Sequence, residues 1–178
     1  MLQQMDESII SLPLPIELDN PLFFTDKIIK VEKNPSGLGT ENFIYEAFFY
    51  NGMSSFKPWE NQAILIPEVL EEWEKVREQL SELFQNRSQN KILNVMKKGI
   101  GLFLQFLFWS NDRPVSLIKP IPSEPLDCKP VNLEERIAFI ISRPILFHSF
   151  RQLSELMVEQ EKAYVKKNIM KKTSKPNG

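Results

Sequence analysis

The chain has 178 residues, of which 42% are hydrophobic and 25% are charged, with a single histidine and a single cysteine. This size and composition are ordinary for one folded domain and argue against disorder of the whole chain. The net charge of −1 gives no overall attraction to nucleic acid or to anionic lipid, and one cysteine cannot form an internal disulfide. We therefore expect a single helical domain spanning residues 1–178.

Prolines punctuate the N-terminal segment, residues 1–40. The stretch 12–15, Leu-Pro-Leu-Pro, is expected to be extended, because the residue before a proline avoids the helical conformation. Asp19 or Asn20 as a cap, followed by Pro21, is typical of a helix start, so we expect a short helix that carries Leu22, Phe23, Phe24 and Ile28. We find no sequence pattern that indicates a β-hairpin.

Two helices are expected in the middle of the chain. The first covers residues 40–51, with Thr40 as its N-cap and Gly52 as its terminator. The second covers residues 67–85, where apolar residues recur at alternating spacings of four and three, as in a helix packed along another helix. These apolar residues are Val69, Trp73, Val76, Leu80 and Leu83.

A third helix, about residues 89–110, is apolar almost all round, and we expect it to be the buried centre of the fold. Its longest apolar run, Ile100 to Trp109, is shorter than the roughly 20 residues of a membrane span, so no span is expected. Lys98 lies on its narrow polar stripe. A buried Lys98 would need a carboxylate partner from the preceding helix, but we favour a solvent-facing stripe.

Prolines exclude a regular element between Asp112 and Val131. Asn132 as N-cap, with Glu135 three residues later, resembles a capping box and predicts a fourth helix that Pro144 ends. A fifth helix is expected from Pro144 to about Met170. The predicted fold is all-α, an irregular bundle of about five helices around the central helix at about 89–110.

The inventory of reactive side chains gives little support for catalysis. Cys128 and His148 are single residues of their types, so no cluster with zinc-ligand spacing exists. No nucleophile is placed by the sequence next to His148, which we interpret as a helix-surface residue. We expect no metal, no cofactor and no catalytic residues, and the chain is not predicted to be an enzyme.

Two features of the sequence could form interaction surfaces. Trp59 and Glu60, in a loop after Pro58, and Arg113, in a turn, could form a recognition surface, because aromatic residues and arginine dominate interface hot spots. A tryptophan after a proline, however, more often packs its loop onto the body. The second feature is the basic C-terminal tail, residues 162–178, which could bind phosphates or only solubilise the helix end. Its candidate anion-binding residues are Lys162, Lys166, Lys167, Lys171 and Lys172.

Several short motifs together resemble the YpoC-like family of small bacterial proteins. They are Ser11-Leu12-Pro13 with the run Asn20 to Phe24, the Pro58-Trp59-Glu60 loop, and Arg143-Pro144 followed by Phe150-Arg151-Gln152-Leu153 and Leu156. The resemblance would span most of the chain. It implies a helical bacterial protein of the cytosol and assigns no catalytic residues.

These observations favour a non-enzymatic protein-interaction or adaptor module in the cytoplasm, because the N-terminus lacks the basic-then-apolar pattern of a leader. The partner would be a protein whose identity the sequence does not indicate. The alternative is an accessory factor that binds nucleic acid through the lysine tail, although the net charge does not support it.

Overall fold

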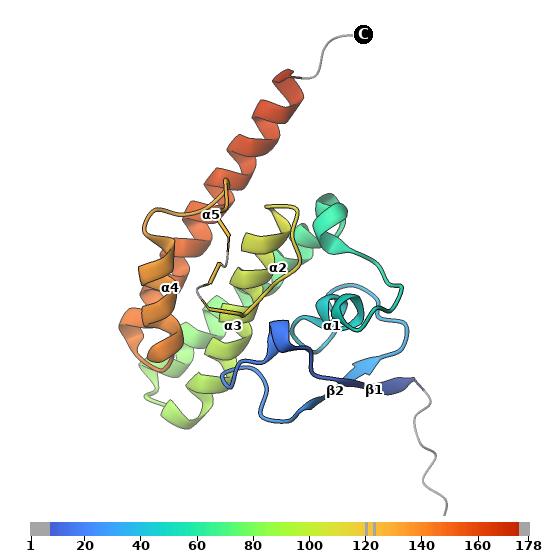
Figure 1. Ribbon diagram of the computed structural model, residues 1–178. Helices are drawn as coiled ribbons and strands as arrows, with labels where there is room; N and C mark the ends of the chain where they lie inside the picture. Colours follow the sequence, from blue (N-terminus) through green and yellow to red (C-terminus); the bar gives the residue numbers. More distant parts are fainter. Residues whose placement is uncertain (1–7, 120, 123, 175–178) are drawn as a thin grey trace, which may run out of the picture.

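Most of the chain is helical, and the computed structural model describes residues 8–119, 121–122 and 124–174. Figure 1 shows the helices gathered beside a small sheet. The elements in chain order are β1 (Ile9–Pro13), η1 (Ile16–Leu18), β2 (Ile28–Glu32), α1 (Ile44–Tyr50), η2 (Pro58–Glu60), α2 (Gln62–Gln85), α3 (Gln89–Trp109), α4 (Leu133–Ser142) and α5 (Phe147–Ser174). The described residues thus contain five α-helices, as predicted.

An antiparallel pair of strands corrects the expectation of an all-α fold. β1 pairs with β2, and Leu12 lies opposite Ile29 in the register. Leu12, Ile29 and Val31 are buried, because alternate residues of a strand face the same side and here that side is the core. The fold is therefore mostly helical with a small two-stranded sheet.

The short helix expected after Asn20 is also wrong. The Asn20 side-chain oxygen accepts a hydrogen bond from the backbone N–H of Leu22 at 2.9 Å. Asparagine commonly closes a turn in this way, and here the turn is not continued into a helix. Residues 21–23 form that turn, and Ile28 begins β2 instead of ending a helix.

The central position of α3 is confirmed. All residues from Gly99 to Ser110 are buried, and α3 packs along α2 and also against α5. A Cβ atom on Gly99 would lie 3.1 Å from the Trp73 ring and 3.2 Å from Leu153, so this glycine lets both neighbouring helices approach closely. α3 is long and apolar enough for a membrane span. However, 72% of its most apolar 18-residue stretch is buried inside the protein, as in the core helix of a globular protein.

α1 and α2 differ from the prediction mainly in their starts. α1 begins at Ile44, and the residue before it, Phe43, adopts a left-handed conformation, so Thr40 is not the cap. α2 begins at Gln62 and contains Pro67, five residues into the helix. Proline lacks the N–H that would bond the carbonyl four residues earlier, but the helix continues through it. The predicted apolar stripe of α2 faces the core.

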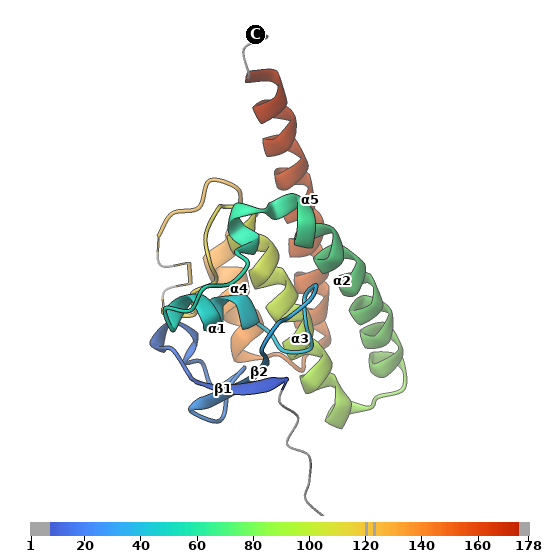
Figure 2. The same cartoon turned by 90° about the vertical axis from the view of Figure 1, so that its right-hand side faces the viewer.

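The last two helices lie where the prediction places them, and only α5 starts later. The backbone of Asn132 is left-handed (φ 53°) and its side chain caps nothing, so the predicted capping box is wrong, although α4 begins directly after it. α5 begins at Phe147, three residues later than predicted. Figures 1 and 2 both show the C-terminal part of α5 standing clear of the other elements.

Candidate functional site

An open groove lies between η1 with the turn that follows it, the proline-rich connector (residues 111–132) and α4. Its volume is about 850 Å³, within the range of about 300–1,000 Å³ that is usual for ligand pockets. Apolar side chains from all three segments form most of its lining. They include Ile16, Leu22, Leu117, Ile118, Ile137 and Ile141. The groove is therefore a candidate binding site for an apolar ligand or segment.

Most of the charged groups at the rim of the groove are already paired. The Lys27 ammonium lies 2.7 Å from the Asp19 carboxylate, and the Lys129 ammonium lies 3.0 Å from Glu134. A backbone hydrogen bond and the Lys129 contact hold the pKa of Glu134 below its ordinary value. Lys119 is the one charged lining residue for which the described part of the chain provides no ion pair.

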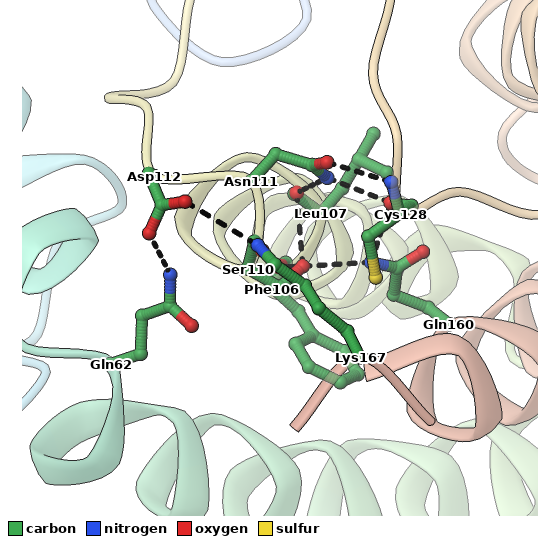
Figure 3. A network of polar contacts seen from close by, with 9 residues as sticks. All are labelled: Gln62, Phe106, Leu107, Ser110, Asn111, Asp112, Cys128, Gln160 and Lys167. Carbon is green, nitrogen blue, oxygen red and sulfur yellow. Dashed lines mark hydrogen bonds and ion pairs between the residues drawn. The ribbon is translucent and has the colours of Figure 1, made fainter. Parts of the chain in front are cut away.

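A polar network closes the C-terminal end of α3, as Figure 3 shows. The Asn111 side chain donates to the Cys128 carbonyl at 2.7 Å and accepts from the Cys128 N–H at 2.9 Å. The Gln160 amide donates to the Ser110 hydroxyl at 2.7 Å and to the Cys128 carbonyl at 3.1 Å. These bonds tie the connector and α5 to the end of α3.

Lys167 and Asp112 extend this network to a third helix. The Lys167 ammonium donates to the Ser110 carbonyl and lies 3.4 Å from the Asp112 carboxylate. The Gln62 amide, at the start of α2, donates to the other Asp112 oxygen at 2.6 Å (Figure 3). A cation at carbonyls that end a helix is a favourable arrangement, so this network has a structural explanation.

Cys128 is not an activated nucleophile. Its thiol is buried, and this burial raises its pKa despite the opposing influence of the Lys167 charge. A thiol is reactive as its thiolate, which a raised pKa disfavours. The Gln160 amide lies 3.5 Å from the sulfur, and no partner for the Gln160 carbonyl oxygen is found among the described residues. The network therefore provides no catalytic pair.

Glu46 of α1 is a second buried polar group, and its side chain is fully enclosed. One carboxylate oxygen accepts hydrogen bonds from the Trp109 indole at 2.8 Å and from the Val115 N–H at 3.0 Å. Burial raises the pKa of Glu46 to about 7, although these hydrogen bonds oppose the rise. An enclosed carboxyl group cannot meet a substrate, so we assign it a structural role.

The structure does not bring Trp59, Glu60 and Arg113 together as one exposed surface. Trp59 is 4% exposed and its ring meets the Phe49 ring edge-on at 5.2 Å, so it packs its loop onto the body. Glu60 is exposed and lies 3.8 Å from Lys57. Arg113 is partly buried and donates to the Pro125 carbonyl at 3.0 Å within the connector.

The lysines of the tail fall into two groups. Lys162, Lys166, Lys171 and Lys172 are exposed on α5, whereas Lys167 is drawn into the network described above. Residues 175–178, which complete the predicted tail, lie outside the described residues, as do residues 1–7 of the N-terminal segment.

The other two residues singled out in the sequence lie on the surface. Lys98 pairs with Glu72 of α2 at 2.8 Å, and about half of its side chain is exposed, so this end of the polar stripe is solvent-facing as expected. The other end is not, because Gly101 and Gln105 are buried. His148 is exposed at the start of α5 and its ring meets Phe139 edge-on at 5.4 Å. The described residues hold no group of three potential metal ligands.

Sequence reasoning missed the groove, Glu46 and Gln160. The groove joins three segments that are far apart in the chain, and no local pattern indicates that they meet. Glu46 lies within an aromatic stretch of α1, which is a weak indication that its side chain is enclosed. Gln160 lies in a polar stretch of α5 and carries no such indication.

Comparison with known proteins confirms the family resemblance, although only two of the motifs noted in the sequence, Arg143-Pro144 and the run from Phe150 to Leu156, lie in the residues that the family model matches. The family model described as YpoC-like protein matches residues 63–172, which run from the start of α2 into the last turns of α5. A Bacillus subtilis (strain 168) protein named "Uncharacterized protein YpoC" is 33% identical over 115 residues, which cover 64% of this chain and 70% of that protein. No solved structure matches the chain. The chain belongs to the YpoC-like protein family.

Proposed function

We propose that the protein is a non-enzymatic interaction module that docks a short apolar segment of a partner protein in the groove beside α4. The observation that supports this proposal is the groove itself, whose apolar lining comes from three separate segments. Its rim carboxylates at Asp19 and Glu134 are already paired, so a cationic partner gains little there. Lys119 favours an acidic group next to the apolar segment.

An occupant larger than a metabolite is favoured by the openness of the groove. Ile16 is 74% exposed and Ile118 is 43% exposed, so the apolar lining reaches the outer surface. Small-molecule sites usually enclose 70–90% of their ligand, with polar groups that converge on it. Here the polar side chains of the rim bond to each other instead, whereas apolar surface open to solvent is typical of protein docking sites.

Binding of nucleic acid is the alternative function. It is supported by the exposure of Lys162, Lys166, Lys171 and Lys172 along one helix. Phosphate contacts of this kind are strongly weakened by salt. If this alternative holds, retention on a DNA column falls steeply with salt and disappears when residues 162–178 are deleted. Retention that survives the deletion excludes a role for the tail.

The groove is tested with a photo-crosslinking residue at Ile118 and, as a control, at Ile64, an exposed position on α2. A partner that crosslinks in the native cell from position 118 alone is then purified and its affinity measured. Ala138, exposed in the groove, is replaced by tryptophan to fill it, and Ala63, exposed on α2, receives the same change as a matched control.

We expect the Ala138→Trp variant to weaken binding at least tenfold and the Ala63→Trp variant to leave it unchanged. Lys119→Gln should weaken binding less, by about fivefold, since it removes one exposed charge pair of about 1 kcal/mol. Circular dichroism verifies that each variant is folded. The proposal fails if no protein crosslinks from position 118, or if filling the groove leaves the affinity of the crosslinked protein unaltered.

A further inference from the structure

The C-terminal part of α5 carries an apolar stripe that faces away from the body. Val158, Val165 and Ile169 are 51%, 49% and 57% exposed. Their spacings of seven and four place them within about 40° of one another around the helix. The opposite face holds Gln160 and Lys167, whose side chains bond to the end of α3. The stripe is therefore turned outward by contacts that fix the rotation of the helix.

Lysines border this stripe. Lys162 and Lys166 lie on one side of it and Lys172 on the other, and all three are exposed. Residues 161–174 contain five lysines and one glutamate, a balance of +4 in a chain whose net charge is −1. The positive charge of the molecule is thus concentrated on the segment that also exposes aliphatic side chains.

From this arrangement we infer that the C-terminal part of α5 binds the surface of an anionic lipid bilayer, lying in the plane of the headgroups. Helices that lie in this interface combine an apolar face, which enters the headgroup region, with lysines that meet the lipid phosphates. Figures 1 and 2 show this part of α5 clear of the body, so a flat surface can approach it. The inference concerns a different surface from the groove and does not depend on it.

Two other kinds of partner, a nucleic acid and a protein, fit the segment less well. A nucleic acid would use the lysines but not the apolar stripe, and Tyr164, the aromatic residue of this segment, packs edge-on against Phe106 at 5.6 Å and is not free to stack on a base. The cores of protein interfaces are rich in aromatic residues and arginine and poor in lysine, which is the reverse of this segment.

The test uses flotation of the full chain with vesicles made of two parts phosphatidylcholine and one part phosphatidylglycerol, at low salt. Pure phosphatidylcholine vesicles and double-stranded DNA serve as comparison ligands. The charge variant is Lys162→Gln with Lys166→Gln, and its matched control is Lys30→Gln with Lys91→Gln, two exposed lysines on other elements. The stripe variant is Val165→Gln with Ile169→Gln.

The wild-type chain should float with the anionic vesicles and not with pure phosphatidylcholine. The charge variant should bind about 25-fold more weakly, because each of its two lysines near an anionic surface contributes about fivefold, whereas the control pair should bind as the wild type does. The stripe variant should lose about tenfold, since it no longer buries apolar side chains. All changed side chains are exposed, so folding should be unaffected.

Three results would overturn the inference. The first is no flotation of the wild-type chain with anionic vesicles. The second is an equal loss for the charge variant and its control, which would indicate a diffuse charge effect. The third is DNA binding as strong as vesicle binding together with an unaffected stripe variant, which would identify the tail as a general polyanion site. Groove variants such as Ala138→Trp should leave vesicle binding unchanged, so failure here is separate from failure of the proposed function.

Discussion

Glu46 and Trp109, 63 positions apart in the chain, are joined by a 2.8 Å hydrogen bond from the indole N–H to the carboxylate in the interior of the protein. The same carboxylate oxygen accepts from the backbone N–H of Val115. This pair therefore ties α1 to the end of α3 and to the start of the connector. Because Leu117 and Ile118 follow two and three residues after Val115 and line the groove, one wall of the groove depends on a buried carboxyl group.

The stability of the protein should fall as the pH rises through neutrality. Burial raises the pKa of Glu46 to about 7 in the folded state, above its ordinary value of 4.5. The folded state therefore favours the neutral carboxyl group, and this advantage is lost as the pH rises from 4.5 to about 7. Between pH 5 and pH 8 the free energy of unfolding should decrease by about 2–3 kcal/mol. Urea denaturation at the two pH values measures the difference.

Glu46→Gln should remove most of this pH dependence. The glutamine amide oxygen can still accept the hydrogen bonds from Trp109 and Val115. Its NH₂ group, however, replaces the carboxylate oxygen for which the described residues provide no partner, so the free energy of unfolding at pH 5 should fall by about 1–2 kcal/mol. Glu78→Gln, an exposed change on α2, should retain the wild-type dependence. If the Glu46→Gln variant keeps the full decrease in the free energy of unfolding between pH 5 and pH 8, another group causes that decrease.

Trp59 should contribute to stability and not directly to binding. Its ring is 4% exposed and packs on Phe49, so Trp59→Ala should lower the free energy of unfolding by about 3–5 kcal/mol. Phe56, in the same loop, is 36% exposed, and its replacement by alanine should cost much less. Urea unfolding of the two variants makes the comparison. Equal costs would mean that Trp59 is not buried in solution as described.

Long, strongly patterned elements could be predicted from the sequence, and short ones could not. The apolar residues of α2 and α3 recur at helical spacing over many turns, so tertiary packing and local pattern agree there. β1 and β2 have five residues each and are separated by 14 residues that contain no hairpin turn. Ile28 to Glu32 does show β-branched residues in alternation, but Asn20-Pro21 favoured a helix more strongly.

The candidate sites could be predicted only where one local segment carries them. The lysines lie close together on α5, so the exposure of Lys162, Lys166, Lys171 and Lys172 could be expected, whereas the contact of Lys167 with the end of α3 could not. The packing of Trp59 onto the body agrees with the usual behaviour of a tryptophan after a proline, whereas what a loop residue meets, and so whether it could form a surface, is not specified by the sequence. Predicting the groove requires the relative positions of η1, the connector and α4, and these positions are determined by long-range contacts.

Gly101 and Asn42 should be energetically coupled. A Cβ atom on Gly101 would lie 2.6 Å from the Asn42 side-chain oxygen, so the Asn42 side chain must move when Gly101 becomes alanine. Alanine is favoured over glycine in a helix by about 1 kcal/mol. Gly101→Ala should therefore stabilise the Asn42→Ala variant by about that amount and the wild-type chain by less, or not at all. A double-mutant cycle by urea unfolding measures the coupling, and strict additivity would contradict the close contact.

Lys167 should hold the middle of α5 against the end of α3. Its ammonium donates to the Ser110 carbonyl while most of its side chain is covered, so Lys167→Met keeps the aliphatic stem and loses the bond. We expect a loss of about 1–2 kcal/mol in the free energy of unfolding, and faster amide hydrogen exchange over residues 162–174. Lys166→Met, one position away and exposed, is the matched control and should exchange as the wild type does. Because the Lys167 bond fixes the rotation of α5, its loss should also free the outward stripe to turn, whereas identical exchange in both variants would show that other contacts position the helix.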